Sequence, residues 1–216
     1  RSIYNDNPGY RKISAFSVDP DNNMNIVAAT KHSIYRSTDG GKTWNKISLN
    51  GLNKRNYITS LSISNNKIYA GTSFNGVFES NGSEFRPSGN GLPGEAYSDS
   101  LTFIEQSASL CTDNTSLYAG FYFGGGLFVK KIDSKKFAPV YDSKEKDLNS
   151  VIYDIRIHNK KLYFSNNHDV FMQEGKKIEP VEKYNSLIKN ISSRNDIISA
   201  SINDETGFYP PISLKF

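Results

Sequence analysis

The fold is decided by a short stretch that occurs four times along the chain, in its clearest form as Lys67-Ile68-Tyr69-Ala70-Gly71-Thr72. Its other copies are Asn25-Ile26-Val27-Ala28-Ala29-Thr30, Ser116-Leu117-Tyr118-Ala119-Gly120-Phe121 and Lys161-Leu162-Tyr163-Phe164-Ser165-Asn166. A second alternating run follows each copy, and its matched residues Ile34, Val77, Leu127 and Val170 lie 43, 50 and 43 residues apart. A third run follows at residues 44–47, 85–87, 137–140 and 178–181, and an apolar alternation precedes each copy at residues 15–18, 58–63, 101–104 and 151–155. Short alternating runs of β-branched and aromatic residues are typical of strands.

Four strands in each repeat, with a period of about 40–50 residues, predict the blades of a β-propeller. We name the strands of a blade A to D, from the axis to the rim. The predicted fold class is all-β, a single β-propeller domain over residues 1–216 with about five four-stranded antiparallel blades. The blades are expected at residues 15–47, 58–88, 100–140, 151–181, and 186–216 together with 2–13. Since both ends of the chain offer a strand C, a segment of a larger propeller is the alternative.

Composition agrees with a sheet protein and excludes several classes of function. The 216 residues include 13 Tyr, 13 Phe and one Trp, and the net charge is only +4. A small, scattered positive charge does not predict nucleic-acid binding, which needs a concentrated basic stripe. The one Cys and three His do not predict a disulfide, a metal site or a bound cofactor. No apolar run approaches the roughly 18 residues of a membrane span.

One motif is specific for the fold. Residues 37–44 read Ser37-Thr38-Asp39-Gly40-Gly41-Lys42-Thr43-Trp44, which resembles the Asp-box repeat of a propeller superfamily that includes sialidases, sortilin-like receptors and photosystem II assembly factors. The resemblance implies a structural role for Ser37, Asp39, Gly41, Thr43 and Trp44 in a C–D turn, on the face opposite the usual ligand site. Trp44 is expected to pack between blades. The corresponding turns at 80–85 and 173–178 keep a glycine but lack the Asp and the Trp.

Propeller geometry indicates where a ligand would bind. The B–C turns and D–A connections share one face, here called the B–C face, and the A–B and C–D turns share the other. We predict ligand-binding residues at the B–C tips: Phe74, Tyr122, Phe123, His32, His168, Asp169 and Glu205. The aromatic residues offer a platform for a sugar ring or a peptide, and the two histidines with the acids offer acid–base groups. The alternatives are packing between blades for the aromatics and simple solvation for the histidines.

The resemblance also suggests an enzyme, which the residues do not favour. A sialidase-like activity needs three arginines around a carboxylate, and none of the seven Arg stands in the Arg-Ile-Pro context that usually supplies the first. No catalytic residue is therefore assigned. We predict a non-catalytic propeller that binds a protein or glycan at its B–C face and is exported to an extracellular, periplasmic or cell-surface location. A glycoside hydrolase or lectin acting on a polysaccharide or glycoconjugate is the alternative.

Overall fold

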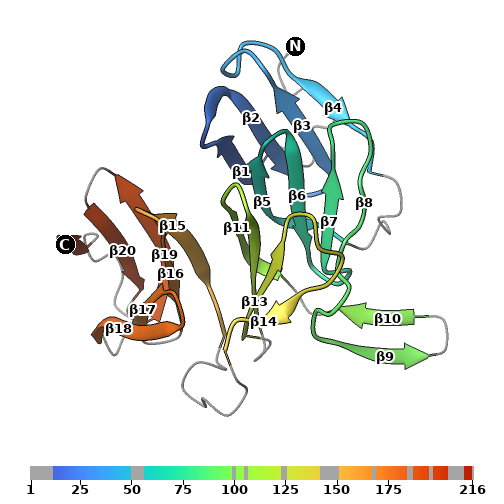
Figure 1. The fold of residues 1–216 in the computed structure, drawn as a ribbon. Coiled ribbons are helices and arrows are strands. Elements are labelled where there is room, and N and C mark those ends of the chain that lie inside the picture. Colours follow the sequence, from blue (N-terminus) through green and yellow to red (C-terminus); the bar gives the residue numbers. More distant parts are fainter. Residues whose placement is uncertain are drawn as a thin grey trace.

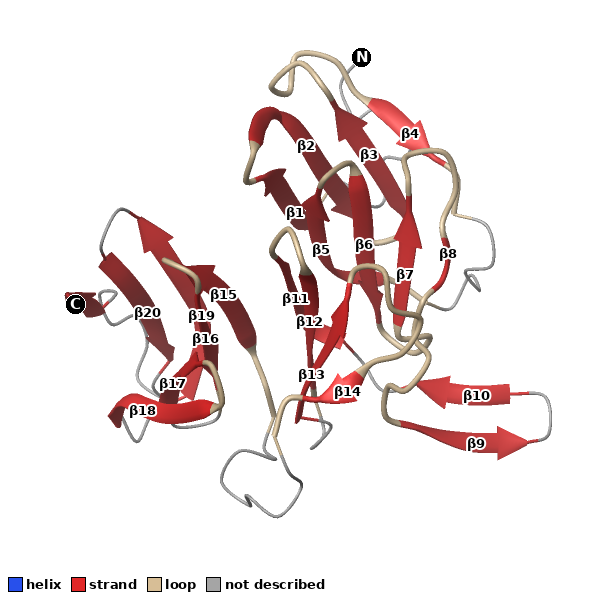
Figure 2. Cartoon of the chain, in the orientation of Figure 1, coloured by secondary structure: helices blue, strands red, loops and turns tan. Residues whose placement is uncertain are grey.

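The structure is a computed structural model that describes residues 12–49, 56–98, 101–104, 107–122, 126–141, 151–166, 169–183, 187–194, 197–203 and 212–215. All regular secondary structure in these residues is β-strand (Figure 2). The predicted all-β class is therefore confirmed.

The strands form successive sheets that are the blades of a propeller (Figure 1). Blade 1 contains β1 (Ile13–Asp19), β2 (Asn22–Thr30), β3 (Ser33–Ser37) and β4 (Asn45–Ile47). Blade 2 contains β5 (Ile58–Ser64), β6 (Lys67–Thr72), β7 (Val77–Ser80) and β8 (Arg86–Pro87). Blade 3 contains β11 (Ser107–Thr112), β12 (Ser116–Phe121), β13 (Gly126–Lys131) and β14 (Ala138–Pro139).

Two more sheets follow. Blade 4 contains β15 (Asp154–His158), β16 (Lys161–Ser165), β17 (Asp169–Glu174) and β18 (Lys177–Lys183). Blade 5 has three described strands, β19 (Leu187–Arg194), β20 (Ile197–Asn203) and β21 (Ile212–Lys215). Within every blade the strands are antiparallel and follow one another in sequence order. This order confirms the predicted propeller architecture of antiparallel, mainly four-stranded blades.

Two strand assignments made from the sequence are wrong. Residues 101–104, expected as strand A of blade 3, are β10 (Leu101–Ile104), which pairs with β9 (Gly94–Ser98) in a separate hairpin that projects from the sheets (Figure 1). The actual strand A of blade 3 is β11, which starts three residues after the end of the expected run and pairs with β12. Ile13, expected at the end of a strand D, instead opens β1 opposite Thr30.

The blades are joined by hydrophobic clusters at each interface. Strand A of each blade packs on strand A of the next, in the order β1, β5, β11, β15 and β19. A buried cluster lies between each pair of neighbours: Val27 and Ile34 with Leu61 and Ile68, Tyr69 and Val77 with Leu117 and Phe121, Leu127 with Ile152 and Phe164, and Tyr163 and Val170 with Ile188 and Ile191. The core is thus divided among the interfaces, as expected for stacked repeats.

Glycine is required where blades 3 and 4 approach most closely. A Cβ atom on Gly120 of β12 would lie 2.5 Å from Ile152 Cγ2 and 3.1 Å from Ile155 Cδ1. Ordinary Cβ contacts are much longer, so no larger residue fits without moving β15. The small residue inside the recurrent stretch is therefore a packing requirement at this interface.

Candidate functional site

The C–D turn of blade 1 is closed by a network of side-chain hydrogen bonds. The Asp39 carboxylate accepts bonds from Thr43 N (2.9 Å), Thr43 Oγ1 (2.5 Å) and Ser37 Oγ (2.7 Å), and Ser37 Oγ accepts one from Gly41 N (2.8 Å). The bonds from Thr43 and then from Ser37 hold the pKa of Asp39 well below its usual range. Gly40 and Gly41 have φ of 70° and 91°, which a residue with a Cβ rarely adopts. All bonds of Asp39 are internal to the turn.

Trp44 was expected to pack between blades, but in the structure it does not lie deep between them. Its side chain is half-buried and belongs to none of the core clusters of the described residues. Its indole Nε1 donates to Gly41 O at 2.9 Å, and the ring lies against Gly41. Trp44 therefore closes its own turn more than it joins blades.

Three tyrosines from three successive blades stand on the B–C face. Tyr122, just after β12, and Tyr153, just before β15, are in an edge-to-face contact with ring centroids 5.6 Å apart and an interplanar angle of 75°. Burial raises the pKa of Tyr122, with smaller electrostatic contributions from Tyr153, Asp154 and Tyr57. Tyr57 directly precedes β5 and therefore stands at the same end of blade 2. All three side chains are half-buried. We call Tyr57, Tyr122 and Tyr153 the tyrosine cluster.

The backbone beneath the tyrosine cluster is fixed by hydrogen bonds to neighbouring turns. Ser73 N donates to Tyr57 O at 3.0 Å, and Tyr57 N donates to Ser73 Oγ at 3.2 Å. Ile58 N donates to Lys31 O at 3.0 Å, which joins the connection to blade 1. In blade 4, Tyr153 N donates to Ser165 O at 3.0 Å, and the preceding residue bonds to the end of β12. The D–A connections that lead into blades 2 and 4 are thus both attached to the B–C ends of two blades.

The predicted ligand-binding residues lie in different settings. Tyr122 belongs to the tyrosine cluster. Phe74 stands at the tip of the B–C turn of blade 2, with 38% of its surface exposed. His32 is exposed, with Nδ1 3.2 Å from Asn56 O. The backbone N–H of Asp169 donates to Asn166 Oδ1 at 2.8 Å. Phe123, His168 and Glu205 lie outside the described residues.

Sequence reasoning missed Tyr57 and Tyr153, because it considered the B–C tips and not the D–A connections. A usable signal was present, since a Tyr stands just ahead of strand A in both blade 2 and blade 4. It also missed Asp154, the first residue of β15 and 5% exposed. The Asp154 carboxylate accepts bonds from Ser109 Oγ (2.8 Å), Ile155 N (2.9 Å) and Ile191 N (2.9 Å), so it joins the inner strands of blades 3, 4 and 5.

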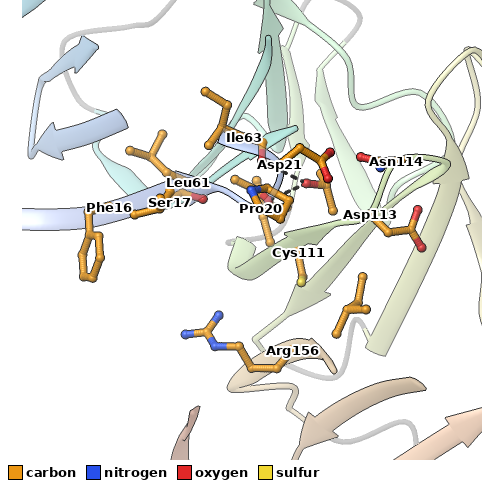
Figure 3. A pocket seen from close by; sticks show the side chains of 15 residues that line it. Phe16, Ser17, Pro20, Asp21, Leu61, Ile63, Cys111, Asp113, Asn114 and Arg156 are labelled. Carbon is orange, nitrogen blue, oxygen red and sulfur yellow. Dashed lines mark hydrogen bonds between the residues drawn. The ribbon is translucent and has the colours of Figure 1, made fainter. Parts of the chain in front are cut away.

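A cavity of about 650 Å³ lies along the axis near the A–B turns, at the opposite end of the inner strands (Figure 3). Its walls include exposed Phe16 of β1, Leu61 of β5 and Cys111 of β11, with Arg156 of β15 across from them. The guanidinium of Arg156 is already engaged, because Nε donates to Ile191 O (2.9 Å), Nη1 donates to Ile155 O (3.1 Å) and Nη2 lies 3.3 Å from Asp154 Oδ2. Burial raises the pKa of Cys111 to about 11, which keeps its thiol protonated and unreactive. The cavity is therefore the weaker candidate site.

Two observations concern the other classes of site. Within the described ranges, no group of three or more His, Cys, Asp or Glu side chains is placed to hold a metal ion. No helix long and apolar enough to cross a membrane occurs in the part of the chain that the structure describes.

The comparisons with known proteins bear on the fold. No protein-family model matches the sequence, and no curated protein is significantly similar to it. Among solved structures, the chain is similar to one in a nidogen–laminin complex (TM-score 0.66, 11% identity, covering 90% of this chain and 73% of that one). It is also similar to YCF48 bound to a D1 peptide (0.60, 11%, 94% and 64%).

A further similar structure is the extracellular domain of the putative hybrid two-component system BT4673 from B. thetaiotaomicron (TM-score 0.63, 14% identity, covering 89% of this chain and 26% of that one). The chain also covers only 56% of the computationally designed protein Ika8, so most of these neighbours are longer than this sequence. At such low identities the likeness concerns architecture alone. Together with the order of the strands, it shows that the chain has a β-propeller fold.

Proposed function

We propose that this chain is a non-catalytic binding module that holds a protein or glycan ligand against the tyrosine cluster on its B–C face. One observation carries the proposal, namely the edge-to-face contact of Tyr122 with Tyr153 on the B–C face of blades 3 and 4, with Tyr57 of blade 2 on the same face. A tyrosine offers a large apolar ring and a polar hydroxyl with few rotatable bonds, which is why tyrosines are enriched at binding hot spots. Phe74 extends the aromatic surface on the same face.

The rigidity of this face supports binding. The backbones of Tyr57 and Tyr153 are each attached to neighbouring turns by hydrogen bonds of 3.0–3.2 Å. The edge-to-face contact of Tyr122 with Tyr153 further limits ring movement. A surface that is already ordered pays less conformational entropy when its ligand binds.

The carboxylates near the cluster favour binding over hydrolysis. A glycoside hydrolase needs two carboxyl groups about 5–10 Å apart, on either side of the scissile bond. Asp154, which influences Tyr122 electrostatically, is buried and uses its oxygens on Ser109, Ile155 and Ile191. These hydrogen bonds join strands of three blades, which favours a structural role for Asp154.

Two structural neighbours support a ligand of this kind. The nidogen structure is a complex with laminin, and the YCF48 structure contains a D1 peptide. We further propose that the chain acts outside the cytoplasm, at an extracellular, periplasmic or cell-surface location. The extracellular domain among the neighbours supports that part of the proposal. The Asp-box resemblance of residues 37–44 is consistent with the same kind of propeller.

The test compares the wild type with a triple variant, Tyr57→Ala, Tyr122→Ala and Tyr153→Ala, on a displayed peptide library and a glycan array. The triple variant is expected to lose binding, and the array that responds identifies the ligand class. The control is Lys42→Ala with Lys176→Ala, two exposed lysines in C–D turns on the opposite face. Thermal unfolding confirms that both variants fold. Equal binding by the folded triple variant, or a glycan cleaved by the wild type, would overturn the proposal.

A further inference from the structure

The tyrosine cluster has the chemistry of a cation site. We infer that it recognises a positively charged lysine or arginine side chain of a protein partner, an inference that rests on the proposed binding function. The ring faces of tyrosine carry partial negative charge and attract an ammonium or guanidinium group within about 6 Å of the centroid. Rings set at a large angle to each other form the walls of a corner, and Tyr122 and Tyr153 meet at 75°.

An ammonium group already lies on this surface. Nζ of Lys31, from the B–C turn of blade 1, stands 5.1 Å from the centroid of the Tyr57 ring. Lys31 is exposed, so its ammonium remains over the ring although water is available to it. The contact shows that a member of the tyrosine cluster accepts a cation in this structure. It also makes Lys31 an internal competitor for a cation from a partner.

Negative charge lies behind and beside the rings. The buried carboxylate of Asp154 is close enough to contribute to the raised pKa of Tyr122. At the start of β17, Oδ1 of Asp169 is buried and has no hydrogen-bond partner among the described residues. A buried acceptor without a partner is costly, and a donor from a ligand would relieve that cost. The carboxylate of Asp169 favours a cationic ligand over an anionic one, whereas that of Asp154 is already paired with Arg156.

The ligand class follows from these contacts. A lysine or arginine side chain combines an apolar stem, which suits the half-buried rings, with a charged end that donates hydrogen bonds. The chain's own net charge of +4 repels a basic partner at long range, but at 0.15 M salt this repulsion is screened beyond about 8 Å. Recognition therefore depends on the short-range contacts of the tyrosine cluster.

The experiment uses two matched pairs of probes on the full chain, with binding followed by NMR shifts of the tyrosine ring protons at 0.15 M salt. One pair is choline and its neutral carbon isostere 3,3-dimethyl-1-butanol. The other is the blocked peptide Gly-Gly-Lys-Gly-Gly and the same peptide with norleucine in place of lysine. We expect each cationic probe to bind about tenfold more tightly than its neutral match, as a desolvated cation–π contact implies.

Substitutions separate the ring from the hydroxyl. Tyr122→Phe keeps the ring face and is expected to retain most of the preference for cations, whereas Tyr122→Leu, of similar apolar character, is expected to lose it. Lys31→Gln removes the internal ammonium and is expected to strengthen binding of choline several-fold. Equal binding of charged and neutral probes, equal loss in both Tyr122 variants, or weaker binding in Lys31→Gln would overturn the inference. If library peptides bind at the tyrosine cluster without preference for Lys or Arg, this inference fails and the proposed function stands.

Discussion

Replacing Asp154 by alanine is expected to destabilise the propeller strongly. This residue is 5% exposed and lies at the start of β15, where its carboxylate accepts bonds from three groups. In the Asp154→Ala variant the amide of Ile191 and the hydroxyl of Ser109 lose an acceptor. The amide of Ile155 keeps only its longer 3.3 Å bond to Ser109 Oγ. Arg156 also loses the carboxylate that lies 3.3 Å from its Nη2.

The magnitude follows from these groups. Leaving a buried donor without an acceptor costs about 1–3 kcal/mol. The variant leaves two such donors, Ser109 Oγ and Ile191 N, whereas the Arg156 side chain is 42% exposed and regains contact with water. We therefore expect a loss of about 2–6 kcal/mol in the free energy of unfolding. For a domain of this size, each kcal/mol lowers Tm by about 2–4 °C, so Tm should fall by roughly 4–24 °C.

Urea unfolding followed by circular dichroism, together with a thermal melt, measures the effect. The control is Asp133→Ala, because the Asp133 side chain is 98% exposed and makes one long ion pair with Lys67 at 3.6 Å. Such a surface pair contributes little, so the control should change stability by less than about 1 kcal/mol. A Tm for Asp154→Ala within 2 °C of the control, a margin near the change from about 1 kcal/mol, would refute the role of this carboxylate in joining blades.

Three further outcomes are expected. Gly120→Ala should lower stability by about 1–3 kcal/mol through the clash with Ile152 Cγ2. Adding Ile152→Val should leave that loss largely in place, because valine keeps the Cγ2 atom. A Tm equal to the wild type for Gly120→Ala would contradict the packing. Trp44→Ala should cost only about 1–2 kcal/mol in urea unfolding, since a half-buried ring loses less than a core aromatic; a loss above 4 kcal/mol would restore the interblade interpretation. Burial acts to raise the pKa of Glu79, but the bonds from Ser88 and Lys130 and the Lys130 charge hold that pKa below its usual value. Its stabilisation is therefore present above the usual pKa of a glutamate and is lost as pH falls through the lowered pKa; Glu79→Gln should flatten that part of the stability–pH curve.

The sequence predicted the sheets because the two middle strands of each blade, B and C, carry clear patterns. Strands B and C contain the recurrent stretch and its alternating successor, in which Ile68 and Val77 are fully buried. Strand A is harder to recognise, since some of its buried positions are polar. Ser60, Ser109 and Asp154 are equivalent in the pairing of strands A and B and are all buried. An apolar run such as residues 101–104 was therefore preferred over the true strand, β11.

The candidate site was predicted only in part, for a geometric reason. Tyr122 and Phe74 stand at B–C tips and could be named from the repeat alone. Tyr57 and Tyr153 reach the same place from D–A connections, and local periodicity does not show which connections converge in space. The role of Asp154 depends on residues 45 and 37 positions away, Ser109 and Ile191. Contacts between blades produce no pattern within the sequence of a single repeat, so the repeat alone does not predict them.

The route between blades 2 and 3 has a practical consequence for engineering. The chain leaves β8 at the rim, forms the hairpin of β9 and β10, and only then returns to the axis as β11 (Figure 1). These two strands form a sheet of their own, separate from the sheets of the blades. Lengthening such a connection costs little closure entropy, about 0.6 kcal/mol for each doubling. The segment between β9 and β10 is thus the position of choice for inserting a fluorescent reporter or an affinity epitope, because an insertion there interrupts no strand of a blade.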